Sequence, residues 1–451
     1  MGASISIAQC KSHYNTTVDC SVTPNDSGGF QTIAGYERGE VPPEPDIAGI
    51  GIVSVFIAVA SFAFAIGVFD VIWTVVKHNS TTHQRFKTSG FQRPRWASKF
   101  SRSKFFQALV ISCSDQQVFT GGAYLVTIRF WKGCFITAYH YNIVANMLLL
   151  TCATHLMSVV ISKNYFERLL LACLRVIFIT VVFAMTGLLL SNQNASNNVP
   201  FPTKVPPSNE TDSLLLSQAV CFQNGEDSIE QLKQLLLDSV GNGTAVERAL
   251  LQSTPGNYIQ GWNLYLVILI WYGVSILAEL GRCCHRSRKK HREAAEHNGW
   301  HKRDNCFVKF FSGVGRFSYG VYLLGGIGIC GTTVVMSSLY IMNLRRWVKR
   351  SRWLELDEGG QSEEDDATSF GQLVPIILVG LTAFTFLSIL SGNFPSTPQR
   401  VQSELGHYDE NVGSALLPCS RSWIAVALTL GYFNDKSLQS EGSIDLGSGS
   451  C

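Results

Sequence analysis

Three neighbouring apolar segments of the chain carry side chains that could do acid–base chemistry or anchor a ligand. The run Ser-Asp-Gln-Gln occupies positions 114–117, His155 lies in the next apolar segment, and Arg175 lies in the one after that. An ionisable group within lipid is expensive, so it is either buried between helices or part of a function. An Asp, a His and an Arg that converge in a helical bundle could handle a proton or hold an anionic ligand.

The position at which the second apolar helix starts decides whether these groups can meet. If it starts near Phe105, Asp115, His155 and Arg175 lie about 15, 9 and 14 Å from the cytosolic surface, at a rise of about 1.5 Å per residue. All three could then meet. Alternatively, Ser114 and Gln117 have the spacing of a capping box that starts a helix, which would leave Asp115 at the cytosolic interface. The sequence leaves both readings open.

The third apolar segment carries polar groups on two faces. His140, Thr151 and His155 fall within about 60° of one another at the helical period, and Asn142 and Asn146 lie on roughly the opposite face. A helix that is polar on two faces is expected to be central in its bundle. The candidate intramembrane polar site comprises Asp115, Gln116, Gln117, Tyr139, His140, His155 and Arg175.

The elements that must position these side chains are membrane spans. Hydrophobic residues make up 46% of the 451-residue chain, and charged residues only 15%, against about 25% in soluble domains. The formal net charge of +3 gives no reason to expect a nucleic-acid partner. Apolar runs long enough to cross a bilayer predict an all-α, polytopic bundle of seven spans. They cover about 47–76, a second segment ending near Trp131, 139–161, 166–190, 258–280, 318–342 and 373–390.

The charges between the spans predict their orientation, because Lys and Arg accumulate in cytosolic loops. Residues 78–104 contain seven Lys and Arg and no carboxylate, and residues 282–303 are also strongly basic. Both loops are therefore expected on the cytosolic side, with the N-terminus outside and the C-terminus in the cytosol. Five basic residues at 345–352 contradict this orientation, because they follow the sixth span on the expected outer side. Seven carboxylates follow them by position 366. A sixth segment that re-enters instead of spanning is the alternative.

N-glycosylation sequons test the same topology independently, since they are used only on the lumenal side. One sequon, Asn79, lies in the first basic loop and should stay unmodified. The other five lie in predicted outer segments, at Asn15, Asn25, Asn194, Asn209 and Asn242. The sequence thus predicts a multi-pass glycoprotein of the secretory pathway, in the plasma membrane or the endoplasmic reticulum. Its expected partner is the lipid bilayer, with a ligand or substrate that the sequence does not identify.

Four cysteines, Cys10, Cys20, Cys134 and Cys221, fall in predicted outer segments, where disulfides can form. Four cysteines allow three pairings. One of them joins Cys134 to Cys221 and Cys10 to Cys20, and the sequence does not choose among the three.

The predicted organisation follows from the spans. It comprises an outer N-terminal segment at 1–45, four spans at 46–191, an outer loop with a short amphipathic helix at 192–257, three spans at 258–392, and a cytosolic, largely disordered tail at 393–451. No metal site or cofactor is predicted, because the histidines of the basic loop 282–303 lack metal-ligand spacing. Gly326, Gly328 and Gly331 match the dinucleotide-binding spacing, but they lie in an apolar span without a preceding strand. With Gly320 and Gly325 they form a small-residue face for helix packing instead.

Short motifs give the chain a resemblance to a family. They are the run 114–117 followed by Thr120 and Gly121, then Tyr-His at 139–140, then Thr-His-Leu at 154–156, with a weaker echo at 370–372. Over residues 46–190 the chain resembles a group of uncharacterised fungal polytopic membrane proteins. The resemblance implies a membrane location and a fungal source, and it carries no activity.

Three classes of function compete. A receptor or sensor is the first hypothesis, because an outside N-terminus and seven spans look like a seven-helix receptor by fold-level analogy. The Asp-Arg-Tyr and Asn-Pro-x-x-Tyr motifs of such receptors are missing. The alternative is a membrane-embedded enzyme acting on a lipid or terpenoid substrate, with Asp115 and His155 as acid and base and Arg175 orienting an anionic group. A transporter ranks third, since the sequence shows no matching halves.

Overall fold

The computed structural model describes residues 5–25, 29–84, 102–162, 165–167, 169–193, 201–223, 261–296, 306–357 and 360–366, and single residues between 372 and 384. These residues belong to one compact unit, 1–391. Several predictions lie outside them: the tail, the amphipathic helix of the outer loop, the sequons Asn194 and Asn242, and nearly all of the seventh segment.

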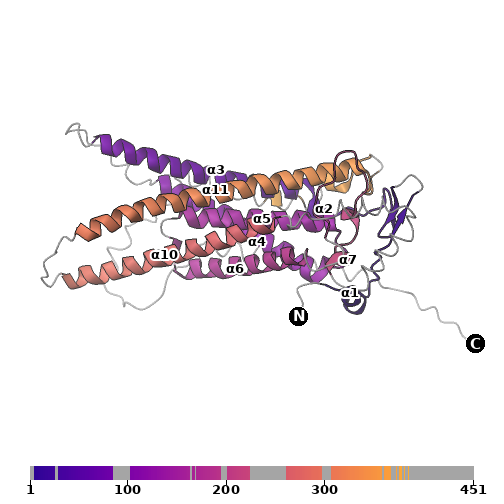
Figure 1. The fold of residues 1–451 in the computed structure, drawn as a ribbon, viewed down its shortest axis with the longest axis horizontal. Helices are drawn as coiled ribbons and strands as arrows, with labels where there is room; N and C mark the ends of the chain where they lie inside the picture. The colour runs from indigo at the N-terminus through magenta and orange to yellow at the C-terminus, as the bar shows by residue number, and fades with distance from the viewer. Residues whose placement is uncertain are drawn as a thin grey trace, which may run out of the picture. The chain divides into compact units, whose positions relative to one another are not determined.

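Six long helices form the body of the described chain (Figure 1). They are α3 (Ile50–Gln84), α4 (Arg102–Thr127), α5 (Ala138–Ile161), α6 (Leu169–Asn192), α10 (Trp262–Glu296) and α11 (Cys306–Ser351). Five are long and apolar enough to cross a membrane, over Pro45–Trp73, Ala138–Ile161, Leu170–Asn192, Trp262–Arg282 and Gly320–Ser351. The helix outside that set is α4, which carries the polar run 114–117. The chain is thus mainly helical, with several helices of the kind that multi-pass membrane proteins use.

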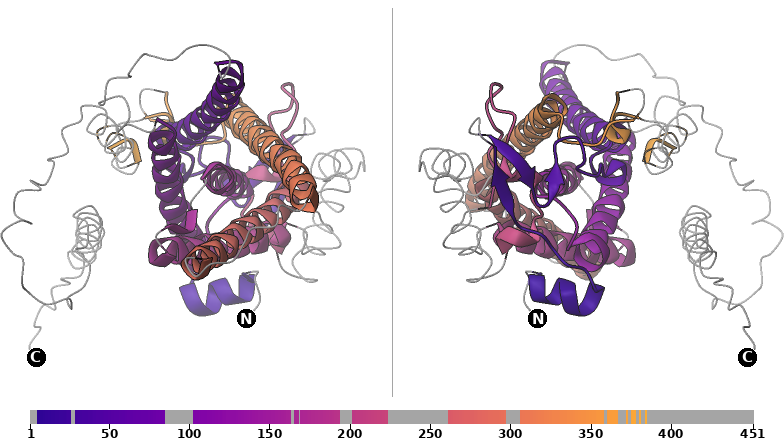
Figure 2. Two further views of the ribbon diagram at one scale, coloured as in Figure 1. Left: turned by 90° about the vertical axis from the view of Figure 1, so that its left-hand side faces the viewer. Right: turned by 90° about the vertical axis from the view of Figure 1, so that its right-hand side faces the viewer.

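The helix α5 lies inside a ring made by the other five. Neighbours in the ring are α3, α4, α6, α10 and α11, and α11 closes it against α3; the end-on views show α5 enclosed (Figure 2). Every residue of the α5 segment is buried, against 28–39% of the other four apolar segments. Large apolar side chains such as Leu170, Leu277 and Leu324 face outward from the ring. The prediction of a central third helix is confirmed.

The N-terminal segment folds over one end of this bundle, and the all-α prediction missed its small sheet (Figure 1). It contains α1 (Ile7–Tyr14), an antiparallel sheet of order β1-β2-β3, and α2 (Pro45–Ala48). The strands are β1 (Val22–Pro24), β2 (Phe30–Ile33) and β3 (Tyr36–Glu37). Strands this short show no usable alternation of polar and apolar residues. The short elements after α4 are η2 (Ile128–Lys132), η3 (Tyr165–Glu167), η4 (Leu214–Leu216), α7 (Val220–Gln223) and η5 (Glu363–Asp365).

Two disulfides fasten this segment to the bundle. Cys10 is bonded to Cys134, just before α5, and Cys20 is bonded to Cys221 in α7. The disulfides join the four cysteines that the sequence singled out, in one of the three pairings that it left open. Both bridges start in the N-terminal segment, because that segment lies across both loops. We call the end of the bundle that carries these bridges the disulfide end.

The helix α11 reaches the same end and contains the whole of the predicted sixth segment, 318–342. It runs without a break from Cys306 to Ser351, and Leu354 then forms a bridge with Val41 of the N-terminal segment. Two cations of its basic end are ion-paired, since Arg345 and Lys349 lie 3.0 and 2.8 Å from the carboxylate of Asp365. Part of the basic run that contradicts the predicted orientation is thus paired with the acidic run that follows it.

The glycines of α11 serve two different purposes. A Cβ atom at Gly325 or Gly326 would lie 2.6–3.1 Å from Trp271 or Val160, and one at Gly331 would lie 2.8 Å from Phe64. These three allow close packing against α10, α5 and α3, as predicted. Gly320 and Gly328 have open space at the Cβ position, so the predicted small-residue face is a packing face only in part.

Candidate functional site

The polar run 114–117 lies in the interior of α4, so the helix does not start at Ser114. Since four consecutive residues point around a whole turn, they reach three different helices. Ser114 contacts α5, Asp115 contacts α6, and Gln117 donates a hydrogen bond of 2.9 Å from Nε2 to the Phe56 carbonyl of α3. Gln116 is buried as well. The reading of Ser114 as a helix cap was wrong, because the residues before it continue the helix.

Asp115 and Arg175 form a bidentate ion pair between α4 and α6. Arg175 donates from Nε at 2.9 Å to each carboxylate oxygen of Asp115, and from Nη2 to Oδ2 at 2.7 Å. The two side chains are 29% and 24% exposed, respectively. Paired charges with fork geometry can occupy a low-dielectric position that neither could occupy alone. The predicted meeting of Asp115 and Arg175 is therefore seen.

His155 does not join that pair. Its Nδ1 atom lies 2.9 Å from Ser114 Oγ, and its ring stands edge-on to the rings of Tyr165 and Tyr272, at centroid distances of 6.3 and 5.6 Å. Among the described residues its Nε2 atom has no hydrogen-bond partner. Tyr165 lies between α5 and α6. Burial raises the pKa of its hydroxyl, so the phenol stays protonated. A direct Asp115–His155 acid–base pair is thus not formed among the described contacts.

A second polar cluster fixes the disulfide end of α5. His140 Nε2 lies 2.7 Å from Glu364 Oε1, and the Tyr139 hydroxyl donates to Glu364 Oε2 at 3.1 Å. Thr137 Oγ1 lies 2.7 Å from His140 Nδ1, and the Glu44 backbone N–H donates to Glu364 Oε1 at 3.2 Å. His140 and Glu364 are almost fully buried. The cluster joins the central helix, the N-terminal segment and the loop after α11.

The sequence pointed to Tyr139 and His140 but not to their partner. Glu364 is one of seven carboxylates between positions 355 and 366, and nothing in its local pattern marks it as buried. Its neighbour Glu363 is exposed. Only the way the loop after α11 returns to α5 distinguishes the two.

A cavity of about 720 Å³ opens between α10 and α11 and reaches the central helix. Its rim carries exposed residues of both helices, among them Val267, Gly328 and Met336. Buried Asn146 of α5 and Ser337 of α11 line it as well, and the Ser337 hydroxyl has no hydrogen-bond partner within the described chain. A volume in the range of about 300–1,000 Å³ with few polar groups is typical of small-molecule sites. We call it the lateral cavity.

In the described residues no group of three or more His, Cys, Asp or Glu side chains could hold a metal ion. No family model, curated protein or solved structure matches the chain. The resemblance to fungal membrane proteins therefore stays a prediction.

Proposed function

We propose that this chain is a seven-span membrane receptor or sensor that binds a neutral, lipophilic ligand in the lateral cavity. The observation that carries the proposal is that the cavity touches Asn146, near the middle of a completely buried helix. That helix is hydrogen-bonded at both ends, through His140 at the disulfide end and His155 toward the far end. A ligand that displaces α5 should alter the hydrogen bonds of both His140 and His155, because a close-packed interior transmits displacement.

The polarity of the cavity supports a neutral ligand. Asn146, Asn263, Thr332 and Ser337 supply amide and hydroxyl groups, and none of the described residues that line the cavity is ionisable. The exposed rim faces outward from the ring, where lipid would lie, so a sterol or terpenoid alcohol could enter sideways. The Ser337 hydroxyl could pair with a hydroxyl of such a ligand.

Filling the cavity tests the proposal. Gly328→Leu adds a side chain where a Cβ has open space, so it should mimic a ligand without a clash. In this variant we expect backbone hydrogen exchange to change several-fold at the far ends of α6 and α10, meaning the ends opposite the disulfide end. Ergosterol should cause the same change in the unmodified protein. Gly273→Leu in α10 is the matched control: its Cβ position is also open, it does not line the cavity, and it should leave far-end exchange unaltered. Ergosterol binding and cavity filling that both leave the far ends unchanged would disprove a sensor.

Glycosylation mapping tests the orientation that the proposal requires, with the N-terminus outside. Asn15, Asn25 and Asn209 are exposed, so we expect each Asn→Gln change to remove one glycan and shift the band on a denaturing gel. Asn79→Gln should shift nothing. A glycan at Asn79 would reverse the orientation.

A membrane-embedded enzyme is the second candidate. The observation that favours it is the Nε2 atom of buried His155, which has no hydrogen-bond partner among the described residues. The Ser114 hydroxyl at Nδ1 would orient the imidazole ring of such an acid or base. Lipid extracts distinguish the two candidates, because loss of a metabolite in a His155→Ala strain indicates catalysis and a receptor predicts no such loss.

A further inference from the structure

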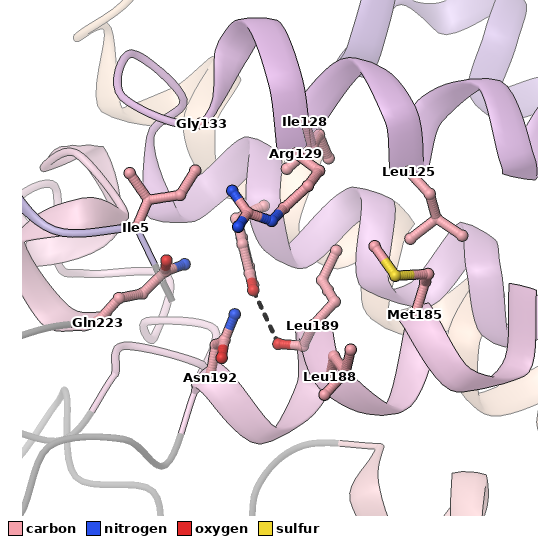
Figure 3. A pocket seen from close by; sticks show the side chains of 11 residues that line it. Ile5, Leu125, Ile128, Arg129, Gly133, Met185, Leu188, Leu189, Asn192 and Gln223 are labelled. Carbon is pink, nitrogen blue, oxygen red and sulfur yellow. Dashed lines mark hydrogen bonds between the residues drawn. The ribbon is translucent and has the colours of Figure 1, made fainter. Parts of the chain in front are cut away.

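The disulfide end holds a second cavity, distinct from the lateral cavity and shown in Figure 3. It has a volume of about 340 Å³ and lies between α4, α6 and the N-terminal segment. Its lining residues are Ile5, Leu125, Ile128, Arg129, Gly133, Tyr141, Met185, Leu188, Leu189, Asn192 and Gln223. The lining is apolar except for one cation and a few uncharged polar groups.

The polar groups gather at one side of this cavity (Figure 3). Arg129 turns its guanidinium toward the centre, near Asn192 and Gln223, whereas Leu125 and Met185 lie deeper in the bundle. At about 1.5 Å per residue, Leu125 is about 6 Å below Arg129 along α4, and Met185 is about 10 Å below Asn192 along α6. The cavity therefore has a cationic mouth and an apolar floor.

The helix carrying the cation departs from α-helical geometry at this place. Ile128–Lys132 form a π-helical turn, a rare conformation that often marks functional sites. Phe130 and Trp131 on the same turn are 57% and 63% exposed, as expected of an aromatic belt at a membrane interface. In a membrane-spanning bundle, these two aromatic side chains would place the mouth of the cavity at the depth of the lipid head groups.

The N-terminal segment forms one wall of the cavity. Ile5 packs against Gly133, where any added Cβ would overlap its side chain, and the Cys10–Cys134 disulfide holds this wall in place. A Cβ atom at position 133 would also lie 2.8 Å from the Ile128 carbonyl oxygen, so glycine allows the wall to approach closely here.

We propose that this cavity binds a single-chain anionic amphiphile of the fatty-acid type, with its head group on Arg129 and its chain between Leu125 and Met185. A guanidinium pairs with a carboxylate through two parallel hydrogen bonds. The volume is near the lower limit of about 300 Å³ for small-molecule sites, which suits one acyl chain. The site is separate from the lateral cavity and does not depend on the proposed receptor role.

The test is binding of cis-parinaric acid, a fluorescent fatty acid, to the full chain in phosphatidylcholine nanodiscs. Arg129→Gln should weaken binding about tenfold or more, since hydrogen bonds to charged groups contribute about 1.5–3 kcal/mol and 1.4 kcal/mol is tenfold. Arg129→Lys should restore part of the affinity. Arg346→Gln, an exposed arginine at the same end, should leave it unchanged.

Competitors and a second variant make the result decisive. Oleate should displace the probe and oleyl alcohol should not, whereas equal displacement would overturn the anionic assignment. Displacement by phosphatidylserine in the nanodisc would assign the site to a bilayer phospholipid instead of a free fatty acid. Leu125→Trp should abolish binding while the thermal unfolding temperature is retained. Full binding by a folded Leu125→Trp variant would overturn the location.

Discussion

Glu364→Ala is expected to destabilise the protein by about 3 kcal/mol or more, because it leaves several buried hydrogen-bond donors without their acceptor, at about 1–3 kcal/mol for each. The Glu364 carboxylate accepts from Tyr139, His140 and the Glu44 backbone N–H. Without it, these donors remain buried and unpaired, and each costs free energy. Thermal unfolding in detergent should show a lower midpoint, and the loop after α11 should become accessible to protease.

The neighbouring carboxylate supplies the control for this prediction. Glu363 is exposed, so Glu363→Ala should change stability by no more than about 0.5 kcal/mol. The double variant His140→Ala, Glu364→Ala should be less destabilised than the sum of the single changes, because the two side chains share one interaction. Equal effects of Glu363→Ala and Glu364→Ala would mean that the buried cluster does not stabilise this end.

The apolar spans could be predicted because each is encoded locally. The run that becomes α5 was expected to begin at 139 and to be central, and the helix Ala138–Ile161 is wholly buried. Its polar residues gave the signal, since Asn142 and His155 on opposite faces leave no face for lipid. For the five helices that are long and apolar enough to cross a membrane, hydropathy and helical period predicted both the elements and the place of the third helix.

The disulfide end could not be predicted, because its contacts join residues far apart in the chain. The partner of Cys10 is 124 positions away, and the buried Glu364 is indistinguishable in pattern from exposed Glu363. Local signals even misled: Ser114 and Gln117 have capping-box spacing, yet they lie inside α4. Polar residues occupy these positions because Ser114 bonds to His155 of α5 and Gln117 bonds to the Phe56 carbonyl of α3.

Breaking the Asp115–Arg175 pair is expected to have the second large effect. Asp115→Ala and Arg175→Ala should each destabilise the protein by about 3 kcal/mol, because each leaves a charge without its partner in a low-dielectric position. The exchange Asp115→Arg, Arg175→Asp should recover part of that loss, since it restores opposite charges between α4 and α6. Chemical denaturation in mixed micelles measures all three variants.

The energetic coupling between Asp115 and Arg175 decides whether the ion pair itself causes the loss of stability. Thr180→Ala on the same helix is the matched control, because Thr180 is exposed and its hydroxyl donates to the Val176 carbonyl of its own helix, and it should change stability by less than about 0.5 kcal/mol. A bidentate pair predicts that Asp115→Ala and Arg175→Ala are strongly non-additive in a double-mutant cycle. If the two effects simply add, each residue stabilises the bundle through other contacts, and α4 and α6 are held together by their apolar faces alone.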